Sequence, residues 1–166
     1  MISKLFNFFK FKKGVPFDPK LIAEFNQDHK NLVKLALEIK QLAENETSPL
    51  LIKNQLKTLK VEILVHFLHE EKTLYKYLNA LYKNDEDNRE LVEDFNQSMH
   101  KIQSQVENFM ETYTSSYAKY DEKFISDFNG VVLLLAKRIE TEEKYLYSLY
   151  NEKIKTIGSN EFSKIK

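Results

Sequence analysis

Apolar side chains recur every three or four residues along most of this chain, which is the spacing that places them on one face of an α-helix. Short polar stretches divide the pattern into four segments. It predicts helices over about residues 18–45, 49–82, 88–117 and 121–152. Long helices joined by short links favour antiparallel neighbours, so the chain is predicted to be an all-α, up-down-up-down four-helix bundle.

Turn and cap residues mark where the bundle begins and where its helices are joined. Gly14 and Pro16 interrupt the chain before the first helix, and the Thr47-Ser48-Pro49 turn supplies the cap and first turn of the second. We therefore divide the chain into an N-terminal arm (1–17), the bundle (18–152) and a C-terminal tail (153–166).

The N-terminal arm is both aromatic and basic. It contains Phe6, Phe8, Phe9 and Phe11 among Lys4, Lys10, Lys12 and Lys13. We expect these rings to pack across the bundle or against a sister subunit, and the second arrangement would give a homodimer. The alternative is a weak amphipathic anchor on a membrane surface or on a partner.

Composition narrows the class of protein. The 166 residues suit a single domain, and 25 basic residues balance 25 acidic ones, so no excess charge favours nucleic acid. Cysteine is absent, which excludes disulfides, thiolate metal sites and cysteine nucleophiles. No apolar run approaches the roughly 20 residues that a transmembrane helix needs. We expect a soluble, cytoplasmic protein.

Polar side chains interrupt the predicted core stripes at mid-bundle depth. His66 and Glu70 lie one turn apart on the apolar face of the second helix, about 40° around its axis. His29 lies in the stripe of the first helix. The stripe of the fourth helix contains Phe124, Phe128, Val131, Leu135, Arg138, Glu142, Tyr145 and Leu149. Because a buried polar group is unfavourable without a partner, these groups are predicted to meet one another or a metal ion.

The second half of the chain repeats the first. A shift of 70 residues places Phe25-Asn26-Gln27 on 95–97, and a shift of 72 places the second helix on the fourth. The matched pairs are His29 with Met99, His66 with Arg138, Glu70 with Glu142, Glu71 with Glu143, Leu74 with Leu146 and Tyr75 with Tyr147. The bundle is therefore predicted to be a pseudo-twofold pair of helical hairpins.

The third helix presents a methionine where the first presents a histidine. Met99 falls on the apolar stripe, whereas His100 lies about 160° from Ile102 around the helix. His100 is therefore predicted to face solvent and is the less favoured ligand. His69, at the edge of the second helix's stripe, is predicted to line the rim of the site.

Two interpretations of the inward polar residues remain open. In the first, His29, His66, Glu70 and Glu142 bind one metal ion through two nitrogens and two carboxylates, ligands that iron, manganese and zinc accept. Two ions are disfavoured because Arg138 brings a fixed positive charge. In the second interpretation there is no metal, and Arg138 bridges Glu70 and Glu142 through charge-assisted hydrogen bonds.

These residues resemble the hemerythrin-like family of the HHE cation-binding type. The resemblance lies in His29, in the run His66-Phe67-Leu68-His69-Glu70-Glu71, and in the pair Glu142-Glu143, and it covers about residues 20–150. It implies a non-haem di-iron centre in a four-helix bundle that serves oxygen binding, iron or oxygen sensing, or related redox roles. His29, His66, Glu70 and Glu142 match ligand positions of the family. Met99 (or His100) and Arg138 stand at two others, so one iron ion is favoured over two.

A shorter match resembles the regulator of sigma D family of bacterial anti-sigma proteins. It consists of His66-Phe67 and of Arg138 with Glu142-Glu143. This resemblance implies a metal-free bundle that presents a helix face to a regulatory protein. We expect a bacterial metal-binding protein with a sensing, storage or regulatory role and a small ligand such as O2. The alternative is a metal-free interaction module, and neither interpretation predicts an enzyme.

Overall fold

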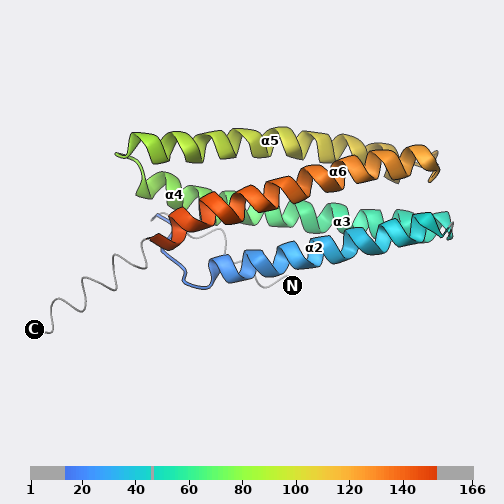
Figure 1. Ribbon diagram of the computed structural model, residues 1–166, viewed down its shortest axis with the longest axis horizontal. Helices are drawn as coiled ribbons and strands as arrows, with labels where there is room; N and C mark the ends of the chain where they lie inside the picture. Colours follow the sequence, from blue (N-terminus) through green and yellow to red (C-terminus); the bar gives the residue numbers. More distant parts are fainter. Residues whose placement is uncertain (1–13, 46, 153–166) are drawn as a thin grey trace, which may run out of the picture.

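Four long helical segments run up, down, up and down along one axis (Figure 1). The computed structural model describes residues 14–45 and 47–152. The elements are α2 (Leu21–Glu44), α3 (Pro49–Glu70), the π-helical turn η2 (Glu71–Tyr75), α4 (Lys76–Leu81), α5 (Glu86–Thr114), α6 (Glu122–Thr141) and the π-helical turn η3 (Glu142–Leu146). Residues 147–152 continue the last helix. The prediction of an all-α four-helix bundle is confirmed.

Local sequence explains most helix boundaries. Asp85 and Asp121 each accept a hydrogen bond at 3.2 Å from the backbone N–H three residues later, which caps α5 and α6. Pro49 occupies the first position of α3, where its missing N–H leaves no hydrogen bond unmade. Ser48 precedes it but makes no side-chain cap bond. The predicted helix bounds therefore agree with the structure to within about three residues, a normal margin for helix ends.

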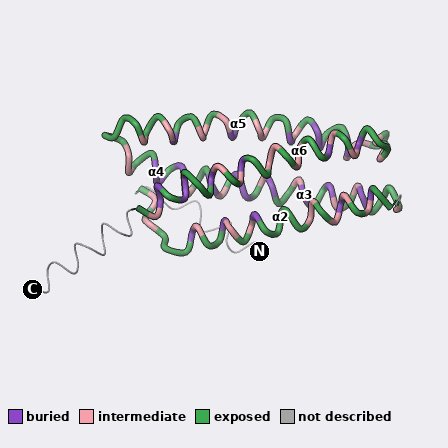
Figure 2. The backbone as a smooth tube through the Cα atoms, in the orientation of Figure 1, coloured by how far each residue is buried: buried purple, intermediate pink, exposed green. Residues whose placement is uncertain are grey.

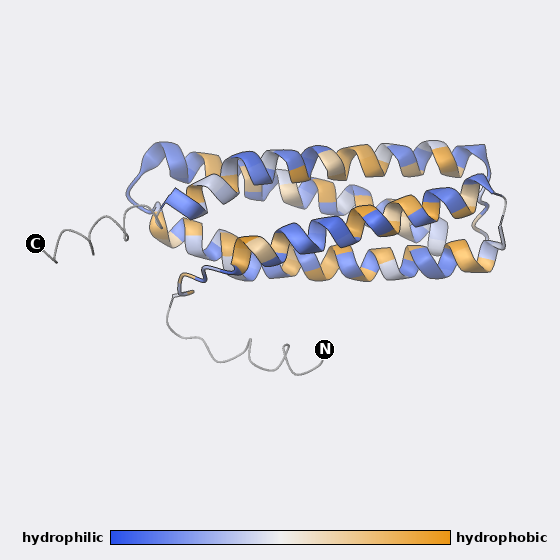
Figure 3. Cartoon of the chain, turned by 60° about the horizontal axis from the view of Figure 1, so that its bottom comes forward, coloured by the Kyte–Doolittle hydropathy of each residue, from blue (hydrophilic) through white to orange (hydrophobic). Residues whose placement is uncertain are grey.

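The core lies along the axis of the bundle, where α2, α3, α5 and α6 each contact two neighbours. Figure 2 shows the buried residues on the inward side of the helices, and Figure 3 shows hydrophobic and hydrophilic residues mixed along each of them. One end is filled by the rings of Phe109, Tyr113, Phe124 and Phe128. At the other end the rings of Phe17, Tyr77 and Tyr150 pack against one another. The polar residues lie between these two aromatic clusters.

The two π-helical turns were not predicted, and they change which side chains face the core. They lie within one residue of the same place in the repeat, directly after Glu70 and from Glu142 onward. A π turn holds one residue more than an α turn, so the inward face shifts by one position. Leu146 and Tyr147 are buried as a result, and the prediction that Tyr145 faces inward is wrong because its side chain is 42 % exposed.

Several predictions fall on the ends of the chain. The phenylalanines of the arm and the tail 153–166 lie outside the described residues, so the homodimer and the proposed division into arm, bundle and tail stay predictions. Within the described part, Val15 and Phe17 pack against the core. Among the described helices, none combines the length and the apolar character needed to cross a membrane.

Candidate metal centre

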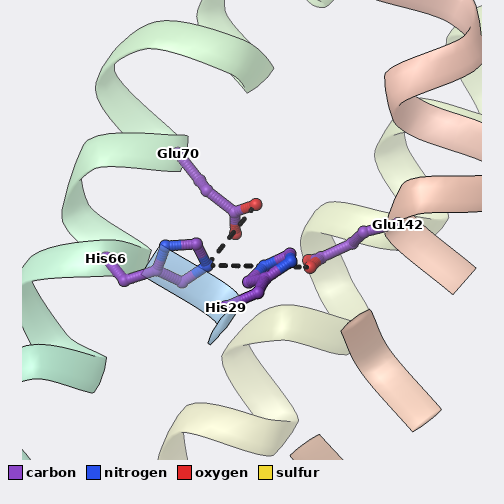
Figure 4. Close-up of side chains that lie close together, drawn as sticks. All are labelled: His29, His66, Glu70 and Glu142. Carbon is purple, nitrogen blue, oxygen red and sulfur yellow. Dashed lines mark hydrogen bonds and ion pairs between the residues drawn. The ribbon is translucent and has the colours of Figure 1, made fainter. Parts of the chain in front are cut away.

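Three helical segments bring four polar side chains to one buried point. His29 comes from α2, His66 and Glu70 from the last turn of α3, and Glu142 from the start of η3. One ligand atom from each lies within 4.8 Å of the others, and Figure 4 shows the four groups pointing toward one another. All four are at most 4 % exposed. This convergence agrees with the pattern of inward polar residues in the sequence.

The two imidazole rings face each other through the same ring nitrogen. The Nε2 atoms of His29 and His66 are 3.1 Å apart. Two nitrogens bound to one ion at about 2.1 Å, with an angle of 90–109° between the bonds, are themselves about 3.0–3.4 Å apart. The separation of these two atoms is therefore that of neighbouring ligands in a metal site.

A carboxylate lies near the outer nitrogen of each ring, and the one beside His29 sets which of its nitrogens carries the proton. His29 Nδ1 lies 3.0 Å from the Glu143 Oε1, and since a carboxylate only accepts, Nδ1–H is the donor. The Asp28 Oδ2 lies 3.6 Å from His66 Nδ1, and this interaction lowers the pKa of Asp28. Burial lowers the pKa of His29 below 6.5. His29 Nε2 is therefore the unprotonated nitrogen of its ring, and its lone pair faces His66 Nε2.

Glu70 is the most deeply buried carboxylate of the group. It is fully inaccessible, and its Oε2 has no hydrogen-bond partner within the described structure. Its Oε1 lies 3.8 Å from His66 Nε2 and accepts a hydrogen bond of 3.3 Å from the Tyr147 hydroxyl. Burial and the nearby charge of Glu142 raise the pKa of Glu70 well above 4.5. A buried carboxylate oxygen without a protein partner is unusual, and this one is free to bind an ion or a water molecule.

Arg138 occupies the opposite side of the site and is 4 % exposed. Its Nε donates to Glu142, and its terminal nitrogens donate to the Tyr75 hydroxyl, to Ser98 Oγ at 2.7 Å and to the Phe95 carbonyl at 3.0 Å. Although burial opposes the charge, Glu142 raises the pKa of Arg138 above its ordinary value. The guanidinium is therefore a permanent cation in the bundle.

The predicted arginine bridge between two carboxylates forms only in part. Among the described residues, Arg138 makes an ion pair with Glu142 and none with Glu70. Glu142 is shared, because its Oε1 accepts from Arg138 while its Oε2 lies 3.7 Å from His29 Nε2. The arginine thus satisfies one carboxylate and leaves the Glu70, His29 and His66 side of the site without a cation of its own.

The remaining predicted residues lie around this centre. Met99 is buried, as the repeat requires, and His100 is exposed on the far side of α5. Glu71 is exposed and pairs with Lys72 at 2.9 Å, so it does not enter the site. His69 is half-buried, and its ring packs edge-on against Phe25.

Sequence reasoning missed the two tyrosines and Asp28. Tyr147 lies 3.4 Å from His29 Nε2, and Tyr75 contacts Arg138. The repeat pairs these tyrosines, but regular helical periodicity turns both away from the core, and only the π turns bring them inward. For Asp28 the signal was its position next to His29, which a helix places on the side facing α3.

A surface groove between α2 and α6 gives a route toward the site. It has a volume of about 690 Å³, and apolar side chains of Val33, Leu37 and Ile139 line part of it. His29 and Glu143 also line it. A small molecule entering this groove would therefore meet the carboxylate that orients His29.

Comparison with known proteins agrees with this geometry. The family model of the hemerythrin HHE cation binding domain matches residues 20–150. The chain belongs to this family. No match was found among curated proteins or among solved structures.

The donor set of this hemerythrin domain fits one cation. Two imidazole nitrogens and two carboxylates supply mixed nitrogen and oxygen ligands and a formal charge of about −2, which balances a divalent ion. The unpartnered oxygen of Glu70 and the paired Nε2 atoms are the atoms such an ion would bind. The opposite half offers Met99 and Arg138, and a guanidinium repels a second cation.

Proposed function

We propose that this hemerythrin-domain protein binds one metal ion through His29, His66, Glu70 and Glu142. Family membership favours iron, and nitrogen and carboxylate ligands also accept manganese or zinc. When bound, the ion supplies a site for a small ligand such as O2. The role is sensing, storage or regulation, without catalysis of a substrate reaction.

One observation carries this proposal. The Nε2 atoms of His29 and His66 face each other at 3.1 Å, while their Nδ1 atoms are turned to Glu143 and Asp28. Two nitrogens at this separation have the spacing of two ligands of one ion, and His29 Nε2 offers its lone pair because Nδ1 carries the proton. The adjoining carboxylates of the site supply the balancing charge.

Metal analysis of the purified protein tests the proposal. The protein is stripped with a chelator, reloaded with Fe²⁺ without oxygen, and separated from free ion before its iron is measured. We expect about one iron per chain, and loss of binding in His66→Ala. The exposed His100→Ala is the matched control and retains full binding. Less than about a tenth of an equivalent of iron, manganese or zinc in the wild-type protein would rule the proposal out.

The alternative proposal is a metal-free module that binds a regulatory protein. An apolar stripe on the outer face of α3 favours it, because Val61, Val65 and Leu68 are each more than half exposed. Arg138 takes the place of a metal in one half of the site, as this alternative requires, but the other half has no such cation among the described residues. A soluble partner retained by the wild-type protein and lost in Val65→Lys, with no metal bound, would support the alternative. The regulatory partner and the cytoplasmic location stay predictions.

A further inference from the structure

The internal repeat divides the site into two corresponding halves. Glu70 corresponds to Glu142, and each is adjacent to or part of a π-helical turn. Tyr75 and Tyr147 correspond as well, and each hydroxyl reaches across the bundle to the other half. The two halves therefore share a backbone construction and differ in a few side chains.

The difference is that one half holds its own cation. Arg138 corresponds to His66 in the repeat, and Met99 corresponds to His29. In the first half two ring nitrogens face each other at the candidate metal site. In the second half a guanidinium group lies at the corresponding place. The positive charge there is part of the polypeptide and cannot dissociate.

The guanidinium is held firmly in place. Its hydrogen bonds to Tyr75, Ser98 and the Phe95 carbonyl use its terminal nitrogens, and the Phe95 ring lies 5.0 Å from its central carbon. Its Nε donates to Glu142. Every one of these partners is neutral except Glu142, so the positive charge is directed at the carboxylate that the metal site also uses.

We propose that Arg138 makes the site select a divalent over a trivalent ion. This inference rests on the proposed metal binding. Glu70 and Glu142 together supply the charge that balances a divalent ion, whereas Arg138 adds a fixed positive charge beside them. The repulsion between this guanidinium and the ion grows with the charge of the ion, so it is larger for a trivalent than for a divalent ion. Arg138 thus disfavours the oxidised form of a bound iron without touching it.

The size of the effect follows from the shared carboxylate. One carboxylate separates the guanidinium from the ion, so the two charges are about 5 Å apart, and an effective dielectric constant near 20 gives roughly a hundred-fold change in affinity for each extra charge on the ion. Each ten-fold change corresponds to about 59 mV in a one-electron reduction potential.

Three variants separate charge from structure. Arg138→Gln removes the charge and keeps an amide that can bond Glu142, and Arg138→Met serves as a second neutral variant if the first does not fold. Arg138→Lys keeps the charge. Lys137→Gln removes the same charge one residue away on the exposed surface, where it pairs with Glu140.

The measurement is the ratio of the affinities for Fe²⁺ and Ga³⁺, each found by competition with a chelator. Ga³⁺ reports the trivalent state without redox chemistry. We expect the ratio to fall at least about ten-fold in the neutral variants and to stay within about three-fold of wild type in Arg138→Lys and Lys137→Gln. The iron reduction potential of the neutral variants should fall by at least about 59 mV.

The outcomes distinguish the two proposals. A wild-type protein that binds neither ion, and neither manganese nor zinc, refutes the proposed metal site and this inference with it. A wild-type protein that binds Fe²⁺, combined with neutral variants whose affinity ratio and potential are unchanged, refutes the role of Arg138 alone. If Arg138→Lys loses the preference as fully as Arg138→Gln, the arginine acts through its geometry rather than its charge, which also overturns the inference.

Discussion

Glu70→Gln separates a metal ligand from a structural carboxylate, because the two roles predict opposite changes in stability. Glu70 is fully buried, and its Oε2 has no partner in the described structure. Its pKa is raised by burial and by Glu142. In the metal-free protein its negative charge is therefore unfavourable at neutral or higher pH, and an amide of the same shape removes that charge.

The size of the expected change in stability follows from the burial of Glu70. We expect Glu70→Gln to raise the free energy of unfolding of the metal-free protein at pH 8 by about 1–3 kcal/mol. For a bundle of this size that is a rise in melting temperature of roughly 3–10 °C. Arg138 keeps its ion pair with Glu142 in this variant, so no buried charge is left alone.

The additional stability that bound metal gives the protein should change in the opposite direction. At a free ion concentration about 100 times Kd, binding stabilises the wild-type protein by about 2.7 kcal/mol, or roughly 10 °C. Glu70→Gln loses a charged ligand, and we expect its shift with metal to fall below about 2 °C. Thermal unfolding followed by circular dichroism, with and without metal after chelator treatment, measures both quantities.

A matched control variant and two outcomes decide whether Glu70 is a metal ligand. Glu71→Gln changes the neighbouring exposed carboxylate and should leave both melting temperatures unchanged. If Glu70→Gln keeps the full shift with metal, Glu70 is not a ligand. If the metal-free variant is instead destabilised, the carboxylate has a structural role and the reasoning from its unpartnered oxygen is wrong.

Three further predictions address the pH response, the second half-site and the support of His29. The pKa of Glu70 is raised above 4.5 in the folded protein, so protonation of this carboxyl stabilises the metal-free fold. This stabilisation is complete below about pH 4.5 and is lost as the pH rises through the pKa that Glu70 has in the folded protein. Denaturant titrations should show this stability declining as pH rises above about 4.5, and Glu70→Gln should flatten the decline. Replacing both Arg138 and Met99 by histidine should raise bound iron from one to two per chain by metal analysis, and an unchanged stoichiometry would contradict the repeat. Glu143→Gln should weaken metal affinity by about 10–100-fold in calorimetry, with a loss under three-fold counting against its role.

Much of the site could be predicted from the sequence because helical periodicity is local. The spacing of apolar residues places His29, His66, Glu70 and Glu142 on inward faces, and their depth along each helix follows from counting residues back from the turns. The repeat then pairs His66 with Arg138, which indicates that the second half differs in charge. Each of these inferences needs only the spacing of residues within one helix or the comparison of two stretches of the sequence.

Contacts between helices could not be predicted in the same way. The repeat did not show that Arg138 would bond Ser98 and the Phe95 carbonyl and make no ion pair with Glu70, because these partners come from α5 and depend on how the helices pack. The same holds for Asp28, whose side chain meets His66 on the neighbouring helix.

Sequence by itself determined the helices, their inward faces and the residue types of the site. Only the tertiary structure decided the two π-helical turns, which turn Tyr75 and Tyr147 inward and Tyr145 outward. One extra residue in a single turn does not visibly change a hydrophobic pattern of period 3.6. It is recognised only when the structure shows that the side chains after the turn face a different side of the helix. The physical reason is that a π turn is unfavourable locally and is stabilised by the contacts its side chains make across the bundle.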